Sequence, residues 1–190
     1  TAKENIESEE SGFRKSAKDN HGYYIGRYES RKNGTQVTVK ASDKVYNSIT
    51  QPDAATVSRG MYSDSNFESD LMNSYAWDTA IVFLQTFDNR ENKESLKPYS
   101  IQNSLNNSRD GLASKGTNNL EDTSKQDVIC NVYDMASNCW EWTTETSSDS
   151  RIPCTYRGGY YSSDTYTSYR SSFSTSGRYT GFSFRSLLYM

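Results

Sequence analysis

The sequence contains one histidine, three cysteines and three prolines among its 190 residues. The lone His21 excludes a two-histidine metal site, and no two cysteines have the CxxC spacing of a zinc module. Three cysteines, Cys130, Cys139 and Cys154, leave two interpretations open: one disulfide with a thiol, or three thiols. The longest apolar run, residues 80–84, is far shorter than the roughly 20 residues of a membrane-spanning helix.

Aliphatic residues are also scarce. Leu, Ile, Val and Phe together account for 29 of 190 residues, which is below the roughly 20% at which disorder becomes a fair expectation. Disorder also requires a high net charge, however, and here the net charge is −3. Fifteen tyrosines and three tryptophans raise the aromatic share to 13%. We therefore expect one folded domain stabilised by aromatic residues, and the slightly negative charge argues against nucleic-acid binding.

The first third of the chain predicts a polar lead-in followed by strands. Residues 1–20 are charged and polar, which is typical of a flexible lead-in or of one solvated helical turn. Residues 22–29 are rich in aromatic and β-branched side chains and predict a strand. Asn33-Gly34 predicts a hairpin turn, with a returning strand at 37–39.

Two helices and an insertion are expected next. Thr50 is a candidate N-cap, Pro52 fits the first helical turn, and this helix should end near Gly60. A second helix is expected over 74–87, where a broad apolar stripe predicts core packing. The stripe comprises Tyr75, Trp77, Ala80, Ile81, Leu84 and Phe87. Residues 88–127 are polar without apolar periodicity and predict a surface insertion.

Four short stretches form a recognisable set: GYYIGRYE at 22–29, NVYDMASNCWEWT at 131–143, RGG at 157–159 and the terminal Phe184-Arg185. Together they resemble the formylglycine-generating-enzyme (sulfatase-modifying factor) family. The resemblance implies an α+β, C-type-lectin-like fold with two helices, twisted antiparallel strands and much irregular loop. It implies a single domain over 21–190, which carries the polar insertion.

The same resemblance implies that the family's chemistry is absent. The enzymes of this family hold copper with a cysteine pair a few residues after RGG, and those positions are Ser163 and Ser168 here. Hydroxyl groups do not replace the thiolates that copper(I) prefers. A related branch binds iron with a histidine cluster, which one histidine cannot supply. We therefore expect a protein that is not an enzyme and requires no cofactor.

The family also carries a calcium ion beside the WEW motif. Matched residue by residue, calcium would take side chains from Asp134 and Glu141 and backbone carbonyls from Ser137 and Cys139. The alternative is that Asp134 caps a turn and Glu141 pairs with an arginine. The sequence leaves both interpretations open.

The last 34 residues, 157–190, have a composition of their own. They contain nine Ser, six Tyr and four Thr but no Asn, Lys, Glu or Gln. One interpretation is an ordinary Tyr/Ser-rich edge, and the other is a recognition surface with the physics of an antibody paratope. The segment and its Arg185-Ser186-Leu187-Leu188-Tyr189 ending resemble the variable proteins of diversity-generating retroelements. In those proteins, adenine-directed mutagenesis converts Asn codons to Tyr, Ser, Thr or Asp.

This resemblance divides the segment into two sets of positions. The scaffold positions would be Arg157, Gly158, Gly159, Arg170, Phe184, Arg185, Leu187 and Leu188. The display positions would be Tyr160, Tyr161, Ser163, Asp164, Tyr166, Ser168, Ser172, Ser174, Thr175, Arg178, Tyr179 and Thr180. Trp140 and Trp142 would form a structural floor beneath the display positions, and buried Arg157 and Arg185 would satisfy loop carbonyls or acids such as Glu141.

Three functions therefore compete. The first is a non-catalytic ligand-binding protein with a hypervariable site, whose partner is a protein or glycan on a target surface. It would sit on a virion or cell surface or be secreted, without membrane insertion or nucleic-acid partners. The second is a formylglycine-generating oxidase, against which Ser163 and Ser168 argue. The third is a structural surface component whose Tyr/Ser face binds nothing specific.

Overall fold

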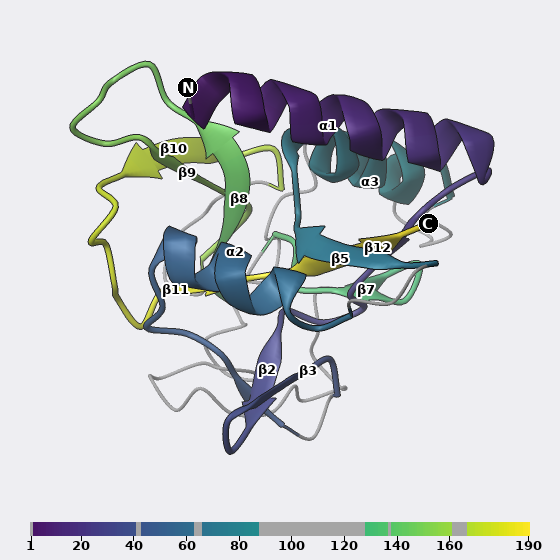
Figure 1. Ribbon diagram of the computed structural model, residues 1–190. Helices are drawn as coiled ribbons and strands as arrows, with labels where there is room; N and C mark the ends of the chain where they lie inside the picture. The colour runs from purple at the N-terminus through teal and green to yellow at the C-terminus, as the bar shows by residue number, and fades with distance from the viewer. Residues whose placement is uncertain (1, 41–42, 63–65, 88–127, 137, 161–166) are drawn as a thin grey trace.

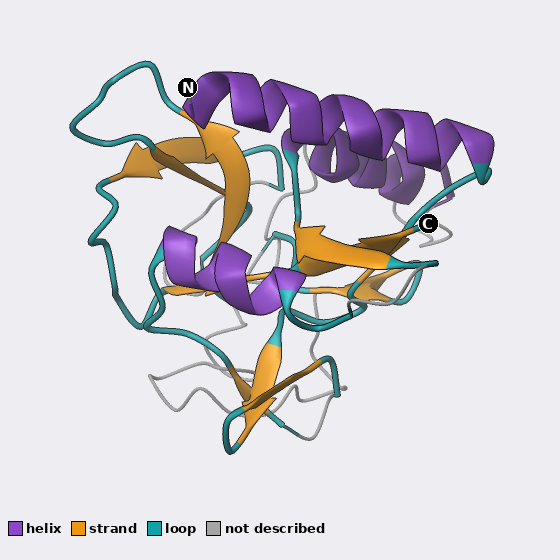
Figure 2. Ribbon diagram, in the orientation of Figure 1, coloured by secondary structure: helices purple, strands orange, loops and turns teal. Residues whose placement is uncertain are grey.

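The structure is a computed structural model that describes residues 2–40, 43–62, 66–87, 128–136, 138–160 and 167–190 (Figure 1). In this part of the chain it is α+β, with helices packed around short strands (Figure 2). The helices are α1 (Ala2–Asp19), α2 (Gln51–Arg59) and α3 (Ser74–Phe87). The strands are β1 (Tyr24–Ile25), β2 (Arg31–Asn33), β3 (Gln36–Thr38), β4 (Lys44–Val45), β5 (Glu68–Leu71), β6 (Val128–Ile129), β7 (Val132–Tyr133), β8 (Trp140–Thr146), β9 (Cys154–Arg157), β10 (Arg170–Phe173), β11 (Phe182–Phe184) and β12 (Ser186–Tyr189). The expected insertion at 88–127 lies outside the described residues.

The strands form small sheets that bring distant parts of the sequence together. One sheet has the order β1-β12-β5, so the first strand pairs with the last, with Ile25 opposite Leu187. A second sheet has the order β10-β9-β8-β11. Its strands pair in the expected antiparallel way except for β8 and β11, which are parallel. The predicted hairpin forms from β2 and β3, and Gly34 in its turn has φ 61°.

The N-terminal segment is a helix, which corrects the prediction of a flexible lead-in or a single solvated turn. α1 runs for 18 residues alongside α3 (Figure 1). Phe13 is 2% exposed and its ring meets those of Tyr23, Tyr75 and Tyr189 edge-on. The Asn20 amide donates to the Met190 carbonyl at 3.1 Å, which joins the end of α1 to the C-terminus. The composition of residues 1–20 does not indicate this packing, because a single aromatic residue, Phe13, supplies most of the apolar contact in a charged segment.

The two helices expected from the sequence are confirmed. Thr50 caps α2 by accepting from the Asp53 N–H at 3.2 Å, and Gly60 follows the last helical residue. In α3, Trp77, Ala80, Ile81 and Leu84 are buried. Tyr75 and Phe87, which the stripe included, are 41% and 61% exposed. At 3.6 residues per turn Tyr75 lies nearly opposite Trp77, and Phe87 is the last residue of the helix.

The buried side chains form two main clusters. One lies between α1, α3 and β12 and includes Phe13, Trp77, Leu84, Met135 and Leu187. The other lies over β8 and β11, and half of its buried residues are aromatic: it contains Trp142, Tyr156, Phe182, Phe184, Leu71, Ile49, Ala54 and Cys154. Large aromatic rings therefore compensate for the small number of aliphatic residues. No helix in the described ranges is both long and apolar enough to cross a membrane.

Candidate functional site

A buried ion pair joins Glu141 of β8 to Arg185, the residue between β11 and β12. The parallel register of β8 and β11 places Trp140 opposite Phe182 and Trp142 opposite Phe184. Glu141 therefore lies opposite Ser183, two residues before Arg185. Arg185 Nε and Nη2 donate to the two carboxylate oxygens at 3.1 and 2.7 Å. This geometry confirms the interpretation in which Glu141 pairs with an arginine.

Arg185 also satisfies two backbone carbonyls. Its Nη1 donates to Gly26 O and its Nη2 to Tyr133 O, each at 2.7 Å. Gly26 belongs to the first motif stretch and Tyr133 to the second, so the terminal arginine connects three of the four motif stretches. A guanidinium group can do this because it carries five donors in a fixed planar array. The motif residues therefore hold the scaffold together.

A second buried carboxylate, Glu29, lies beside this pair. It accepts from the Cys139 N–H at 2.9 Å and from the Asn138 side-chain amide. Burial raises the pKa of Glu29 well above its usual range, and the nearby charges of Glu141 and Asp134 raise it further. Burial likewise raises the pKa of the Cys139 thiol, which disfavours the thiolate form. Cys139 and Cys154 are buried as free thiols.

Among the residues considered for calcium, Glu141 already has a cationic partner. Both of its carboxylate oxygens accept hydrogen bonds from Arg185. Asp134 is buried with φ 64°, and Ser137 lies outside the described residues. Among the residues that the structure describes, no group of three or more His, Cys, Asp or Glu is arranged to hold a metal ion. As placed, Glu141 does not fit a calcium ligand.

The RGG motif forms a second charged junction. Arg157 is 6% exposed and donates to Glu145 at 2.8 Å and to Asp78 at 2.5 Å. Arg170 lies directly opposite Arg157 in the β9–β10 register, and its Nε contacts the other oxygen of Glu145 at 2.5 Å. Glu145 thereby offsets the repulsion between two arginines that face each other across strands.

Gly158 in this motif permits a close backbone approach. Its φ is 84°, a conformation that costs little only for glycine. A Cβ built at Gly158 would lie 2.7 Å from Met135 O and 3.1 Å from the Trp77 ring. The motif therefore fixes the start of the C-terminal segment against both α3 and the loop before β8.

Trp140 and Trp142 lie beneath the C-terminal segment. Trp142 is fully buried and its indole N–H donates to Ile49 O at 2.9 Å. Trp140 stacks on Tyr160 with ring centres 4.3 Å apart and 21° between planes. A Cβ at Gly181 would lie 2.6 Å from the Tyr160 ring, so the glycine leaves room for that ring. Tyr160, expected as a display position, is half-buried against this aromatic floor.

The structure separates the remaining display positions into three groups. Thr175, Arg178, Tyr179 and Thr180 are exposed. Ser168, Ser172 and Ser174 are half-buried, and the Ser172 hydroxyl lies 3.4 Å from that of Thr155 on the neighbouring strand. Tyr161, Ser163, Asp164 and Tyr166 lie outside the described residues. We name residues 174–180 the display loop, because it carries all four exposed positions.

The scaffold positions differ in burial from the display loop. Six of the eight are buried: Arg157, Gly158, Gly159, Phe184, Arg185 and Leu187. Leu188 is half-buried, and Arg170 is exposed while remaining paired with Glu145. Sequence reasoning missed Asn47 and Ser48, which touch the display loop from the segment between β4 and α2. They lie about 130 residues away in sequence, and no motif marks them.

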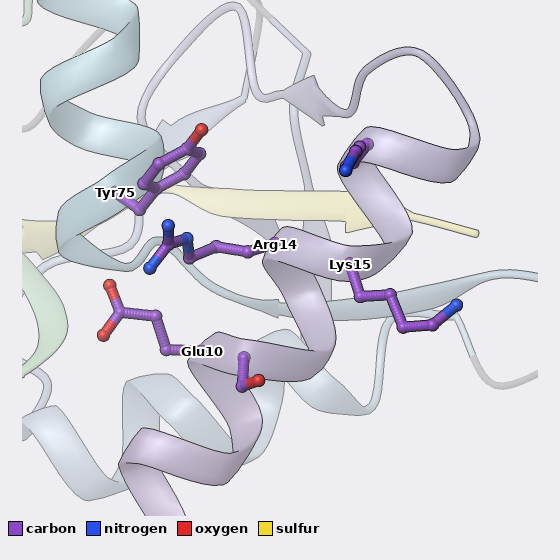
Figure 3. A pocket seen from close by; sticks show the side chains of 6 residues that line it. Glu10, Arg14, Lys15 and Tyr75 are labelled. Atoms are coloured by element: carbon purple, nitrogen blue, oxygen red, sulfur yellow. The ribbon is translucent and has the colours of Figure 1, made fainter.

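A separate cavity of about 600 Å³ lies between α1 and the start of α3 (Figure 3). Its lining residues are Glu10, Ser11, Arg14, Lys15, Lys18 and Tyr75. The Arg14 guanidinium lies over the Tyr75 ring, 5.2 Å from its centre. None of the lining residues belongs to 157–190, so this open groove is distinct from the display loop.

No protein-family model and no curated protein matches the chain. Among solved structures, it is similar to CarF, with 16% identity, a TM-score of 0.49, and coverage of 76% of this chain and 67% of CarF. It is also similar to Treponema denticola variable protein 1, with 16% identity, a TM-score of 0.45 and coverage of 85% of this chain. The match spans 62% of the Treponema protein, which is less than two thirds of its length.

Proposed function

We propose that this protein is a non-catalytic ligand-binding protein that displays a variable, Tyr- and Ser-rich site on a lectin-like scaffold. Its partner is a protein or a glycan on a target surface, and the protein acts on a virion or cell surface or after secretion. The observation that carries this proposal is the division within the last 34 residues. Side chains expected to be invariant, such as Arg157 and Arg185, are buried, whereas Arg178, Tyr179 and Thr180 point to solvent.

Tyr179 illustrates why the display loop suits recognition. It is 57% exposed, yet its ring packs edge-on against Phe173 at 5.5 Å and lies 6.1 Å from Phe182. A ring that is already ordered loses little entropy when a ligand covers it. Tyrosine also offers a large contact area with a polar tip, and neighbouring serines adapt their hydrogen bonds. These properties favour binding to varied surfaces.

The chemistry of the matched residues argues against an oxidase. Ser168, at one of the two copper-cysteine positions, presents a hydroxyl that does not replace a thiolate toward copper(I). Burial raises the pKa of the Cys139 and Cys154 thiols, so neither favours the thiolate form. Incubation with a sulfatase-motif peptide, followed by mass spectrometry, should show an unchanged peptide cysteine. Its conversion to formylglycine would overturn the proposal.

The proposal is tested by sequencing this gene from many isolates. Diversification predicts that substitutions concentrate at Thr175, Arg178, Tyr179 and Thr180, while the buried scaffold positions stay constant. Variation spread evenly over exposed residues of the whole chain would instead favour a structural surface component.

Binding itself is tested with the purified chain on a printed glycan array and on intact target cells. A variant with Thr175, Arg178, Tyr179 and Thr180 replaced by alanine should lose the signal while its circular dichroism stays unchanged. The matched control replaces the exposed Tyr24 and Tyr62, which lie elsewhere on the surface, and should retain the signal. Equal binding by both variants would contradict the assignment of the site.

A further inference from the structure

Three consecutive carbonyls, two at the end of the display loop and one at the residue that follows it, accept hydrogen bonds from outside the loop. Tyr179 O accepts from the Ser48 N–H at 3.2 Å and from the Phe182 N–H at 3.1 Å. Thr180 O accepts from the Asn47 side-chain amide at 2.7 Å. Gly181 O accepts from the Trp140 N–H at 2.9 Å. The backbone of the loop is therefore fixed through main-chain atoms.

Two of these donors, the Ser48 N–H and the Asn47 amide, lie in residues 46–49, which we name the brace. The brace is itself held in place, because the Tyr46 N–H donates to Ser30 O at 2.9 Å and Ile49 O accepts from the Trp142 indole at 2.9 Å. Asn47 is 6% exposed. Ser48 contacts the loop through its main-chain N–H, whereas Asn47 uses its side-chain amide. The Cys139 thiol lies 3.7 Å from the same Thr180 O, but sulfur is a weak donor, so the Asn47 amide is the stronger side-chain donor to this carbonyl.

We propose that Asn47 is a positioning residue of the recognition site, and that the brace fixes the display loop independently of the side chains displayed there. This inference rests on the proposed function for its biological meaning. Every residue at positions 179 and 180 supplies the same carbonyl oxygen. Substitution there therefore changes the surface presented to a ligand while Ser48 and Asn47 keep their acceptors.

One contact between the brace and the loop does depend on a displayed side chain. Arg178 Nε donates to Ser48 O at 2.8 Å. Arg178 is exposed, and hydrogen bonds of exposed side chains contribute little because water competes for the same groups. The buried amide of Asn47 has no such competition, and its removal leaves Thr180 O without that donor.

The inference is tested by amide hydrogen exchange of the unliganded chain, read by mass spectrometry in peptides that cover 174–182 and 46–49. Asn47→Ala should speed exchange in these peptides by about tenfold, as expected for loss of roughly one buried hydrogen bond. The matched control is Asn73→Ala. Asn73 is 8% exposed and caps α3 by accepting from the Ala76 N–H at 2.8 Å, so its loss should affect α3 and leave the display loop unchanged.

A second comparison tests independence from the displayed side chains. The double variant Tyr179→Ser, Thr180→Asn should exchange in the same peptides at the wild-type rate within about twofold. If Asn47→Ala does not fold, Asn47→Asp keeps the side-chain volume while replacing the donor, and the same acceleration is expected.

Two results would overturn the inference. One is equal loop exchange in the Asn47 and Asn73 variants, and the other is loosening by the double variant as large as that of Asn47→Ala. Exchange is measured without a ligand, so these outcomes are separate from those of the proposed function. A well-anchored loop that binds nothing would contradict the proposed function alone.

Discussion

Arg185 and Glu141 form a two-point ion pair in which the side chains are 0% and 1% exposed. They join the last part of the chain to β8, and Arg185 also holds carbonyls from two other motif stretches. A buried ion pair adds little net stability over apolar side chains, but breaking it leaves one charge buried without its partner. This pair therefore specifies how the motif stretches assemble.

Replacing Arg185 should be strongly destabilising. Arg185→Leu leaves the Glu141 carboxylate buried and should lower the free energy of unfolding by roughly 3–5 kcal/mol. The control, Arg170→Leu, removes an exposed arginine whose partner Glu145 keeps Arg157, and should cost less than about 1 kcal/mol. Urea unfolding followed by tryptophan fluorescence measures both. Similar losses in the two variants would show that the buried pair has no special role.

Stability should decrease as the pH rises above the ordinary range of carboxyl groups. Burial raises the pKa of Glu29 and of Glu141, so the folded protein holds these protons more tightly than the unfolded chain does. From the ordinary glutamate pKa of about 4.3 up to the raised folded value, the unfolded chain binds fewer protons. The free energy of unfolding must then fall with increasing pH across that window.

The contribution of Glu29 can be isolated with Glu29→Gln. The variant removes one titrating carboxyl, so its stability relative to the wild type, measured by urea unfolding, should improve as the pH rises from the ordinary glutamate pKa toward the raised folded value. A difference between the two proteins that stays constant with pH would mean that Glu29 titrates at its ordinary pKa.

The close approach at Gly158 predicts a large effect of one methyl group. Gly158→Ala combines a strained φ with a clash against Met135 O and should cost more than about 2 kcal/mol. Gly34 is the matched control: its φ is also positive, at 61°, but nothing lies within 4 Å of its Cβ position. Gly34→Ala should therefore cost only about 1–2 kcal/mol, the backbone strain alone. Thermal unfolding compares the two, and equal shifts would exclude the clash.

The helix α1 should contribute to stability through Phe13. Phe13→Ala should cost roughly 3–5 kcal/mol, because it empties a site enclosed by aromatic rings. Phe87→Ala makes the same chemical change at a helix position that is 61% exposed, and should cost less than about 1 kcal/mol. If Phe13→Ala unfolds at the same urea concentration as the wild type, α1 does not pack on the core.

Sequence patterns predicted the elements whose signals are local. Thr50 and Gly60 marked the ends of α2, Asn33-Gly34 marked the hairpin, and apolar spacing marked α3. The motif stretches offered the pairing of Glu141 with an arginine as one of two interpretations, and the structure contains this pair. These features depend on neighbouring residues or on matched motifs, so they are visible without the fold.

Features that depend on contacts between distant segments were not predictable. The contact of Phe13 with Tyr189 packs the charged helix α1 against the end of the chain. The parallel pairing of β8 with β11 and the Asn47 contact to Thr180 O likewise join segments more than 40 residues apart. Tyr160 was expected to be displayed, but its stacking on Trp140 follows from the space left by Gly181.

Sequencing of the DNA that flanks this gene tests directly whether residues 157–190 form a diversified recognition site. We expect a nearby repeat of the segment's coding sequence that differs from it only at adenines, within codons of the display positions, together with a reverse transcriptase gene. Flanking DNA that contains neither the repeat nor the reverse transcriptase gene would contradict this expectation.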